Sequence, residues 1–289
     1  MLTFLFACVL ENNVNVKPKD TIDTDTSVVI DSGDTQDTAP DETGDSSPPF
    51  IGEPIAVCSV TPSVVDAIYG TAEWIGNTSY DTNGQSIIGF EWTLLSSPAG
   101  STATISSISP NVRNFTPDLA GDYVAQLIVT NDIGQVSEPC VTTLTANAGD
   151  GLWIEMFWTN SGDDMDLHLL KPSGVLGTNS DCYYANCTTG MLDWGVRGVT
   201  DDDPILDLDD IPGTGPENIN IDYPVGGAYT VFVHDYPGSA YIGENNVTVN
   251  VYVGGYLYWT DTRNIDNENY FAPICQIDWR GSATTITEL

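Results

Sequence analysis

The chain has 289 residues, with 41 Asp and Glu against seven Lys and Arg and a net charge of −34. Binding of nucleic acid, or electrostatic docking on an anionic membrane, needs a basic surface, so this balance argues against both. No stretch approaches the roughly 18–20 apolar residues of a membrane-spanning helix. The length indicates about two domains, and 41% hydrophobic residues are enough to build their cores.

Residues 1–10 resemble the end of a bacterial lipoprotein signal. The segment Leu5–Cys8 (Leu-Phe-Ala-Cys) is similar to a lipobox, in which a small residue directly precedes the cysteine that receives lipid. The basic segment and long apolar run of an export signal do not precede it, so we expect the natural start to lie upstream. Lipidation of Cys8 is the expectation, and a free Cys8 in an apolar terminus is the alternative.

Residues 11–50 consist mainly of Thr, Asp, Ser, Pro and Glu. Few apolar side chains are available to compensate for the entropy lost on ordering, and like charges extend the chain. The composition predicts a disordered acidic linker that holds a folded part away from its anchor. Lipobox and linker together predict a protein of the bacterial cell envelope, lipid-anchored to the outer membrane or surface-exposed, and otherwise secreted. A lipid anchor would be its only membrane contact.

Residues 51–147 have the pattern of one small all-β domain. Short apolar or alternating runs, such as Ile87–Leu95 and Tyr123–Thr130, alternate with turn sequences rich in Gly, Asn and Pro. This pattern predicts a β-sandwich. The segments 79–92 and 115–123 contain a Ser-x-Asp turn, a Phe-x-Trp strand and an Ala-Gly-x-Tyr corner, and they resemble a PKD domain, an immunoglobulin-like module. The resemblance implies a spacer or adhesive module, with Trp92 as the core tryptophan.

The cysteines support an oxidising compartment. Cys58 falls in the first predicted strand of the 51–147 domain and Cys140 in the last, where a sandwich brings them together. We expect a disulfide between them, with two buried thiols as the alternative. Cys182 and Cys187 are expected to close a small loop. Cys275 is then buried and unpaired, or it pairs with Cys182 or Cys187, since spacing does not decide connectivity.

Residues 149–289 have strand-like runs separated by Gly-rich turns and long polar loops, which predicts a second antiparallel sandwich. Its motifs resemble, in order, the pattern of the DUF2135 (YfaP-like) family, apart from an inserted Cys182–Cys187 loop and an acidic run at residues 201–203. The family has no established reaction, so the resemblance implies fold and export rather than activity. The matching motifs are Asp164-Met-Asp166-Leu-His168, Pro172-Ser-Gly174, Asp207-Leu-Asp209, Gly213-Thr-Gly-Pro-Glu-Asn218 and Gly227-Ala-Tyr-Thr-Val231.

Clustered carboxylates in this part of the chain predict a Ca²⁺ site. Ca²⁺ takes six to eight oxygen ligands, and Asp-x-Asp at a strand edge puts two carboxylates on one side. Asp164 with Asp166, and Asp207 with Asp209, are the candidate ligands; Glu217 follows in the next turn. The alternative is that these acids form turns and caps, as Asp commonly does. Zn²⁺ is disfavoured because the chain has only two histidines and no Cys-x-x-Cys pair.

The two histidines, His168 and His234, each fall in a predicted strand. If these strands pair, the histidines approach each other and Asp166, so that a metal or acid–base role becomes available. The alternative is two hydrogen-bonded structural imidazoles. No motif marks a nucleophile. Taken together, the sequence predicts a non-catalytic surface lipoprotein for binding or adhesion to a glycan or protein. The alternative function is an accessory or cryptic metal-dependent hydrolase of the envelope.

Overall fold

The computed structural model describes residues 52–190 and 192–289, and within them every regular element is a β-strand. The predicted all-β class is therefore confirmed. The predicted lipobox with Cys8 and the predicted linker at residues 11–50 lie outside the described residues. The described part also contains no helix long and apolar enough to cross a membrane.

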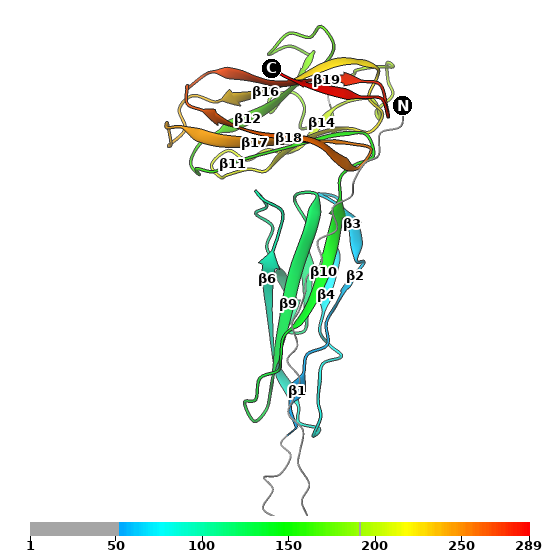
Figure 1. Ribbon diagram of the computed structural model, residues 1–289, viewed down its shortest axis with the longest axis vertical. Helices are drawn as coiled ribbons and strands as arrows, with labels where there is room; N and C mark the ends of the chain where they lie inside the picture. The colour runs from blue at the N-terminus through cyan, green and yellow to red at the C-terminus, as the bar shows by residue number, and fades with distance from the viewer. Residues whose placement is uncertain (1–51, 191) are drawn as a thin grey trace, which may run out of the picture. The chain divides into compact units, whose positions relative to one another are not determined.

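The strands between residues 54 and 147 form two four-stranded sheets and a two-stranded ribbon (Figure 1). Their pairings are antiparallel, except that β3 runs parallel to β10. In spatial order, the first sheet is β2 (Ser59–Thr61), β4 (Ala72–Ile75), β8 (Val112–Phe115) and β7 (Ser106–Ser109), the second is β3 (Val64–Asp66), β10 (Cys140–Asn147), β9 (Gly121–Asn131) and β6 (Ile87–Ser96), and the ribbon is β1 (Pro54–Ile55) with β5 (Tyr80–Asp81).

The core of this first sandwich follows from strict alternation along its longest strand. Every second residue of β9 is buried, because successive side chains point to opposite faces of a sheet. The fully buried tryptophan is Trp74 rather than the predicted Trp92. Trp74 lies on β4, between two neighbouring strands, whereas Trp92 lies on the edge strand β6 and is partly exposed. The two rings pack 6.2 Å apart.

The predicted disulfide between Cys58 and Cys140 is present, with Cα atoms 5.8 Å apart. Cys140 begins β10, but Cys58 lies directly before β2 and not within a strand as predicted. Because β2 and β10 belong to different sheets, the bridge ties the two layers of this sandwich together.

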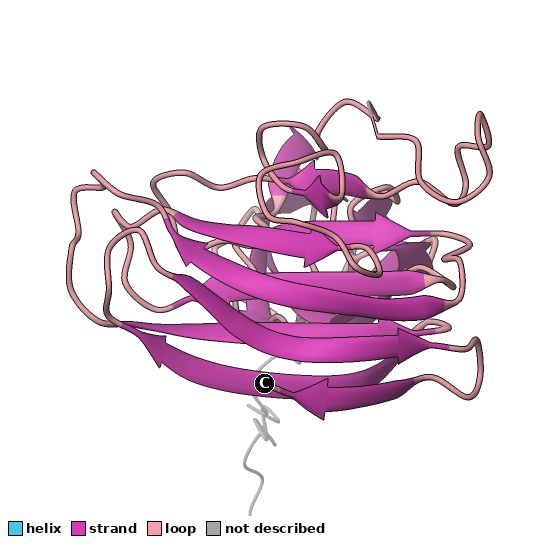
Figure 2. Ribbon diagram, turned by 90° about the horizontal axis from the view of Figure 1, so that it is seen from above, coloured by secondary structure: helices cyan, strands magenta, loops and turns pink. Residues whose placement is uncertain are grey.

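The strands between residues 152 and 288 form two five-stranded antiparallel sheets; Figure 2 shows long strands side by side, with several long loops joining their ends. No described strand of this set pairs with one of the first set, yet residues 50–289 form one compact unit. In spatial order, one sheet is β14 (Ile205–Leu208), β15 (Glu217–Ile221), β11 (Leu152–Trp158), β17 (Asn245–Val253) and β18 (Tyr256–Ile265), and the other is β13 (Asp181–Cys182), β12 (Met165–Leu170), β16 (Gly227–Asp235), β19 (Phe271–Trp279) and β20 (Thr285–Glu288).

The two sheets of this second sandwich enclose an apolar core that includes Ile154, Leu167, Val231 and Val249. Strand β12 is buried at all six of its residues. Since side chains alternate, Met165, Leu167 and Leu169 face this core. Asp166, His168 and Leu170 lie on the opposite face. A strand covered on both faces can therefore carry polar groups that are shielded from water.

The remaining cysteines are also placed. Cys182 and Cys187 form the expected small disulfide loop. Cys275 is free and buried in β19, and burial raises the pKa of its thiol to about 12. The open question of connectivity is thereby settled in favour of an unpaired Cys275.

We predict that the two disulfides contribute unequally to stability. In the chain-entropy model, the 82-residue separation of Cys58 and Cys140 corresponds to about 4–5 kcal/mol, and the five-residue separation of Cys182 and Cys187 to about 2 kcal/mol. Urea unfolding of the Cys58→Ser/Cys140→Ser and Cys182→Ser/Cys187→Ser variants measures both. Equal losses in the two double variants would contradict the chain-entropy account for this protein.

Candidate functional site

Strand pairing brings together an aspartate and both histidines of the chain. The antiparallel register of β12 and β16 places Asp166 directly opposite His234. Oδ2 of Asp166 lies 3.2 Å from Nδ1 of His234. His168, two residues further along β12, has its ring 5.8 Å from that of His234. The two strands therefore pair, and the pairing brings the histidines close to each other and to Asp166, the condition on which a metal or acid–base role depended.

A group of three carboxylates lies on the other side of Asp166. It consists of Asp166 itself, Asp209 just after β14, and Glu217 at the start of β15, each with an oxygen within 4.8 Å of the others. Asp166 and Glu217 are buried, whereas Asp209 is exposed. The group is thus deep at one end and open to solvent at the other.

Glu217 is held at this place by an unpaired stretch of the β12 edge. Strand β13 pairs only with Leu169 and Leu170 of β12, so the backbone N–H of Leu167 has no strand partner on that side. The N–H donates instead to Oε2 of Glu217, at 2.7 Å. No N–H or O–H donor among the described residues reaches the other oxygen, Oε1, although Glu217 is only 1% exposed. A buried polar atom without a partner is rare and needs an explanation.

The carboxylates of this region repel one another. Burial raises the pKa of Glu217 well above its ordinary value, and the charge of Asp166 raises it further. Burial, followed by the charges of Asp166 and Asp209, raises the pKa of Asp164 to about 7. None of the Lys or Arg ion pairs in the described residues involves these acids. The site therefore favours a proton or a bound cation.

The four predicted metal ligands do not all meet. Asp166 and Asp209 join Glu217, and Asp164 interacts with both through charge. Asp207 is not part of the group, because its carboxylate accepts hydrogen bonds from the hydroxyl of Tyr69 and the amide of Asn220. A register shift between Leu206 and Leu208 in β14 breaks the alternation that the Asp-x-Asp argument assumed. Glu217 takes the place that Asp207 was expected to fill.

His168 is held by a buried carboxylate. Its Nδ1 lies 2.9 Å from Oδ2 of Asp181, which also accepts the backbone N–H of Gly177. Its Nε2 is buried and has no hydrogen-bond partner in the described part of the chain. The ring of Tyr183 stacks on it, with centroids 4.9 Å apart. The role of Asp181 as the partner of His168 depends on strand β13 and was not predicted.

A further acidic group consists of Asp163, Asp235 and Glu268. The carboxylate of Asp163 accepts hydrogen bonds from Ser239 and Asn245, so it already serves to hold its loop. Burial, together with the charges of Asp163 and Glu268, raises the pKa of Asp235 to about 6. This group is weaker as a metal site, since protein donors satisfy one of its members.

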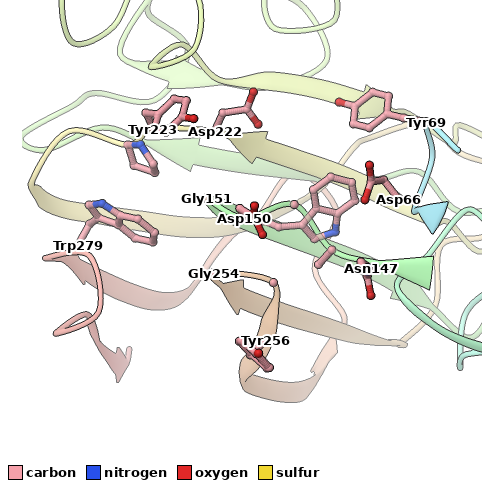
Figure 3. Close-up of a pocket in the computed structure, with 15 residues that line it drawn as sticks. Asp66, Tyr69, Asn147, Asp150, Gly151, Asp222, Tyr223, Gly254, Tyr256 and Trp279 are labelled. Atoms are coloured by element: carbon pink, nitrogen blue, oxygen red, sulfur yellow. The ribbon is translucent and has the colours of Figure 1, made fainter. Parts of the chain in front are cut away.

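Exposed tyrosines line an open pocket elsewhere in the unit formed by residues 50–289 (Figure 3). Tyr69, Tyr223 and Tyr256 are 59%, 72% and 79% exposed. Carboxylates and an amide stand among them, supplied by Asp66, Asp150, Asp222 and Asn147.

No protein-family model matches this sequence, and no curated protein matches it. The resemblances to PKD and DUF2135 domains therefore stay predictions. Among solved structures, carbohydrate-binding modules of the β-sandwich superfamily are similar over 78% of this chain and 84% of that chain, with 12% identity and a TM-score of 0.29. The D00–D0 domain of intimin is similar over 63% and 95%, with 9% identity and a TM-score of 0.24. An endo-fucoidan hydrolase of glycoside hydrolase family 107 is similar over 75% of this chain but 28% of that chain, with 15% identity and a TM-score of 0.26. Likenesses this weak carry no conclusion about function.

We predict that Glu217→Gln stabilises the protein at neutral pH when divalent cations are chelated. The folded state raises the pKa of Glu217 above its ordinary value of 4.5, so the wild type loses stability as pH rises above that value. Glutamine keeps an acceptor for Leu167 and removes the charge. Thermal melts in EDTA at about pH 8 and about pH 4 are expected to show a higher Tm for the variant only at the higher pH. A lower Tm for the variant at both values would contradict the prediction.

Proposed function

We propose that this chain is a non-catalytic surface protein whose C-terminal sandwich is a calcium-stabilised binding head. The observation that carries the proposal is the group of Asp166, Asp209 and Glu217 around a buried glutamate oxygen that no N–H or O–H donor of the described residues reaches. A cation bound there would satisfy that oxygen and neutralise charges that otherwise repel one another.

Calcium fits the chemistry of this group better than other common ions. The ligand atoms are carboxylate oxygens only, which hard cations prefer. Asp164 offers a fourth carboxylate with an unpartnered oxygen, Oδ1. Because Asp209 is exposed, an ion can enter from solvent and keep water among its six to eight ligands. Exported calcium-binding modules typically have dissociation constants of about 10⁻⁴–10⁻³ M.

The proposed partner is a glycan, bound at the tyrosine-lined pocket. Sugars present apolar ring faces that stack on aromatic rings, and hydroxyl groups that donate to carboxylates and amide oxygens. The pocket combines both kinds of group, with Tyr223 and Tyr256 beside Asp150 and Asp222. Exposed aromatic residues gathered at one place commonly mark a binding site. Lipid anchoring at Cys8 in the bacterial envelope completes the proposal.

The alternative of a metal-dependent hydrolase is less well supported. It depends on His168 and His234, which are 2% and 5% exposed. Tyr183 stacks on His168, and Phe271 stacks on His234 with ring centroids 3.9 Å apart. A polymeric substrate has no access to imidazoles covered in this way.

We predict that the full chain binds Ca²⁺ and gains stability from it. At about 10 mM Ca²⁺, the expected dissociation constants correspond to about 1–3 kcal/mol of stabilisation. Calorimetric titration and thermal melts with Ca²⁺ or EDTA measure the effect. Asp209→Asn and Glu217→Gln are expected to abolish it.

The matched control is Asp207→Asn, which changes the same type of residue in the same segment but outside the group. Its Ca²⁺ affinity is expected to equal that of the wild type. A flat titration of the wild type, or equal losses of affinity in Asp207→Asn and Asp209→Asn, would rule out the calcium site.

We predict that the full chain binds an immobilised glycan in an array screen and that the tyrosines of the pocket contact this glycan. Tyr223→Ala and Tyr256→Ala are each expected to weaken binding at least about fivefold, as for a contact residue worth roughly 1 kcal/mol. The control is Tyr270→Ala, an exposed tyrosine outside the pocket. Glycan binding that persists in the Tyr223→Ala/Tyr256→Ala double variant would place the glycan elsewhere.

A further inference from the structure

We propose that Asp166, His168 and His234 form a second metal site, which takes a divalent transition-metal ion of the zinc class. One ligand atom from each of the three side chains lies within 4.8 Å of the other two. The site goes beyond the proposed calcium-dependent binding function, although it shares Asp166 with the calcium group. Both histidines of the chain meet there.

The first argument is the state of His168. Asp181 is a carboxylate acceptor with 0% exposure, so Nδ1 of His168 carries the proton that it receives. Nε2 is then a bare lone pair, and it is buried without any donor among the described residues. A carboxylate that fixes the tautomer of a histidine, with the other nitrogen left for an ion, is the usual surrounding of a metal-binding imidazole.

The second argument is the distance between Asp166 and His234. Two ligands on one tetrahedral ion, each about 2.0–2.1 Å from it, stand about 3.3 Å apart. Oδ2 of Asp166 and Nδ1 of His234 are 3.2 Å apart. Nε2 of His234 faces another oxygen, Oδ1 of Asn269, at 3.3 Å. If Nε2 donates its proton to Asn269, Nδ1 has a lone pair directed at Asp166. A cation bound between these two acceptors would offset their repulsion.

The ligand types separate this site from the calcium group. Imidazole nitrogen suits zinc, copper, iron and nickel, whereas calcium prefers oxygen alone. Three protein ligands also leave a fourth position for water, or for an oxygen of a further ligand. The aromatic rings of Tyr183 and Phe271 cover the imidazoles, so an ion there would be shielded from bulk water. The sequence disfavours zinc because the chain has only two histidines, but the fold places Asp166 beside them as a third candidate ligand.

The test uses the full chain without a histidine tag, freed of metal by a chelator and then loaded with Zn²⁺ or Co²⁺. X-ray absorption of the zinc-loaded wild type is expected to show imidazole scattering, with zinc–nitrogen distances of about 2.0–2.1 Å. Because the chain has two histidines, such scattering assigns the ion to His168 and His234 without any substitution. Zinc bound without imidazole scattering, or no binding of Zn²⁺ and Co²⁺, would overturn the proposal.

Variants then separate the two metal sites. His168→Gln and His234→Gln are expected to weaken Co²⁺ binding more than 100-fold, measured from its visible absorption, and to keep the stabilisation by Ca²⁺. Asp181→Asn is expected to weaken Co²⁺ binding about 10–100-fold, as for other partners of metal-bound histidines. Asp209→Asn is the matched control, because it removes a calcium ligand and leaves the three proposed zinc ligands in place. Equal Co²⁺ affinity in the wild type and in a folded His168→Gln variant would overturn the site, whatever the outcome for calcium.

Discussion

The register of β12 against β16 is the constraint on which the cluster of Asp166, His168 and His234, here called the candidate centre, depends. It places Asp166 opposite His234 and puts Asp166 and His168 on one face, while Leu167 and Leu169 point into the core. A slip of one residue would exchange these faces, burying two charged or polar groups among apolar side chains. The same register that secures the hydrophobic core therefore also assembles the centre.

The cost of this arrangement lies in desolvation. Carboxylates taken out of water lose hydration, and here no Lys or Arg among the described residues compensates for that loss at Asp166, Asp209 and Glu217. A protein can neutralise such a group with a proton or a cation. The raised pKa of Glu217 favours neutralisation by a proton, and the proposed calcium site would neutralise the group with a cation. Stability and pH are therefore coupled in this sandwich, and the proposed calcium site would couple ion binding to both.

The loop that follows β12 has a specific part in this coupling. The Cys182–Cys187 bridge closes a short loop next to Asp181. Asp181 lies in β13, pairs with Leu170 of β12 and holds His168. Tyr183, in the same loop, covers the ring of His168. This loop and the residue directly before it thus supply both the cover and the partner of one histidine.

The sequence by itself determined the features that depend on local periodicity. Alternating apolar residues predicted most long strands of both sandwiches, and the positions of Cys58 and Cys140 predicted their bridge. Spacing also put Asp166 and His168 on one face, since that follows from the geometry of any strand. The short strands β13, β14 and β15 were not predicted, because two to five residues carry little periodic signal.

Only the tertiary structure decided which acids meet. A register shift in β14 turns Asp207 toward Tyr69 and Asn220, away from Asp209. Glu217 joins instead, because the backbone N–H of Leu167, on the edge of β12, has no partner in β13 and donates to the Glu217 carboxylate. Neither effect follows from spacing alone: the first depends on how β14 pairs with β15, and the second on how β12 of one sheet meets Glu217 of the other. Residue type and spacing predict that carboxylates cluster, and the partners of each carboxylate follow only from the packed fold.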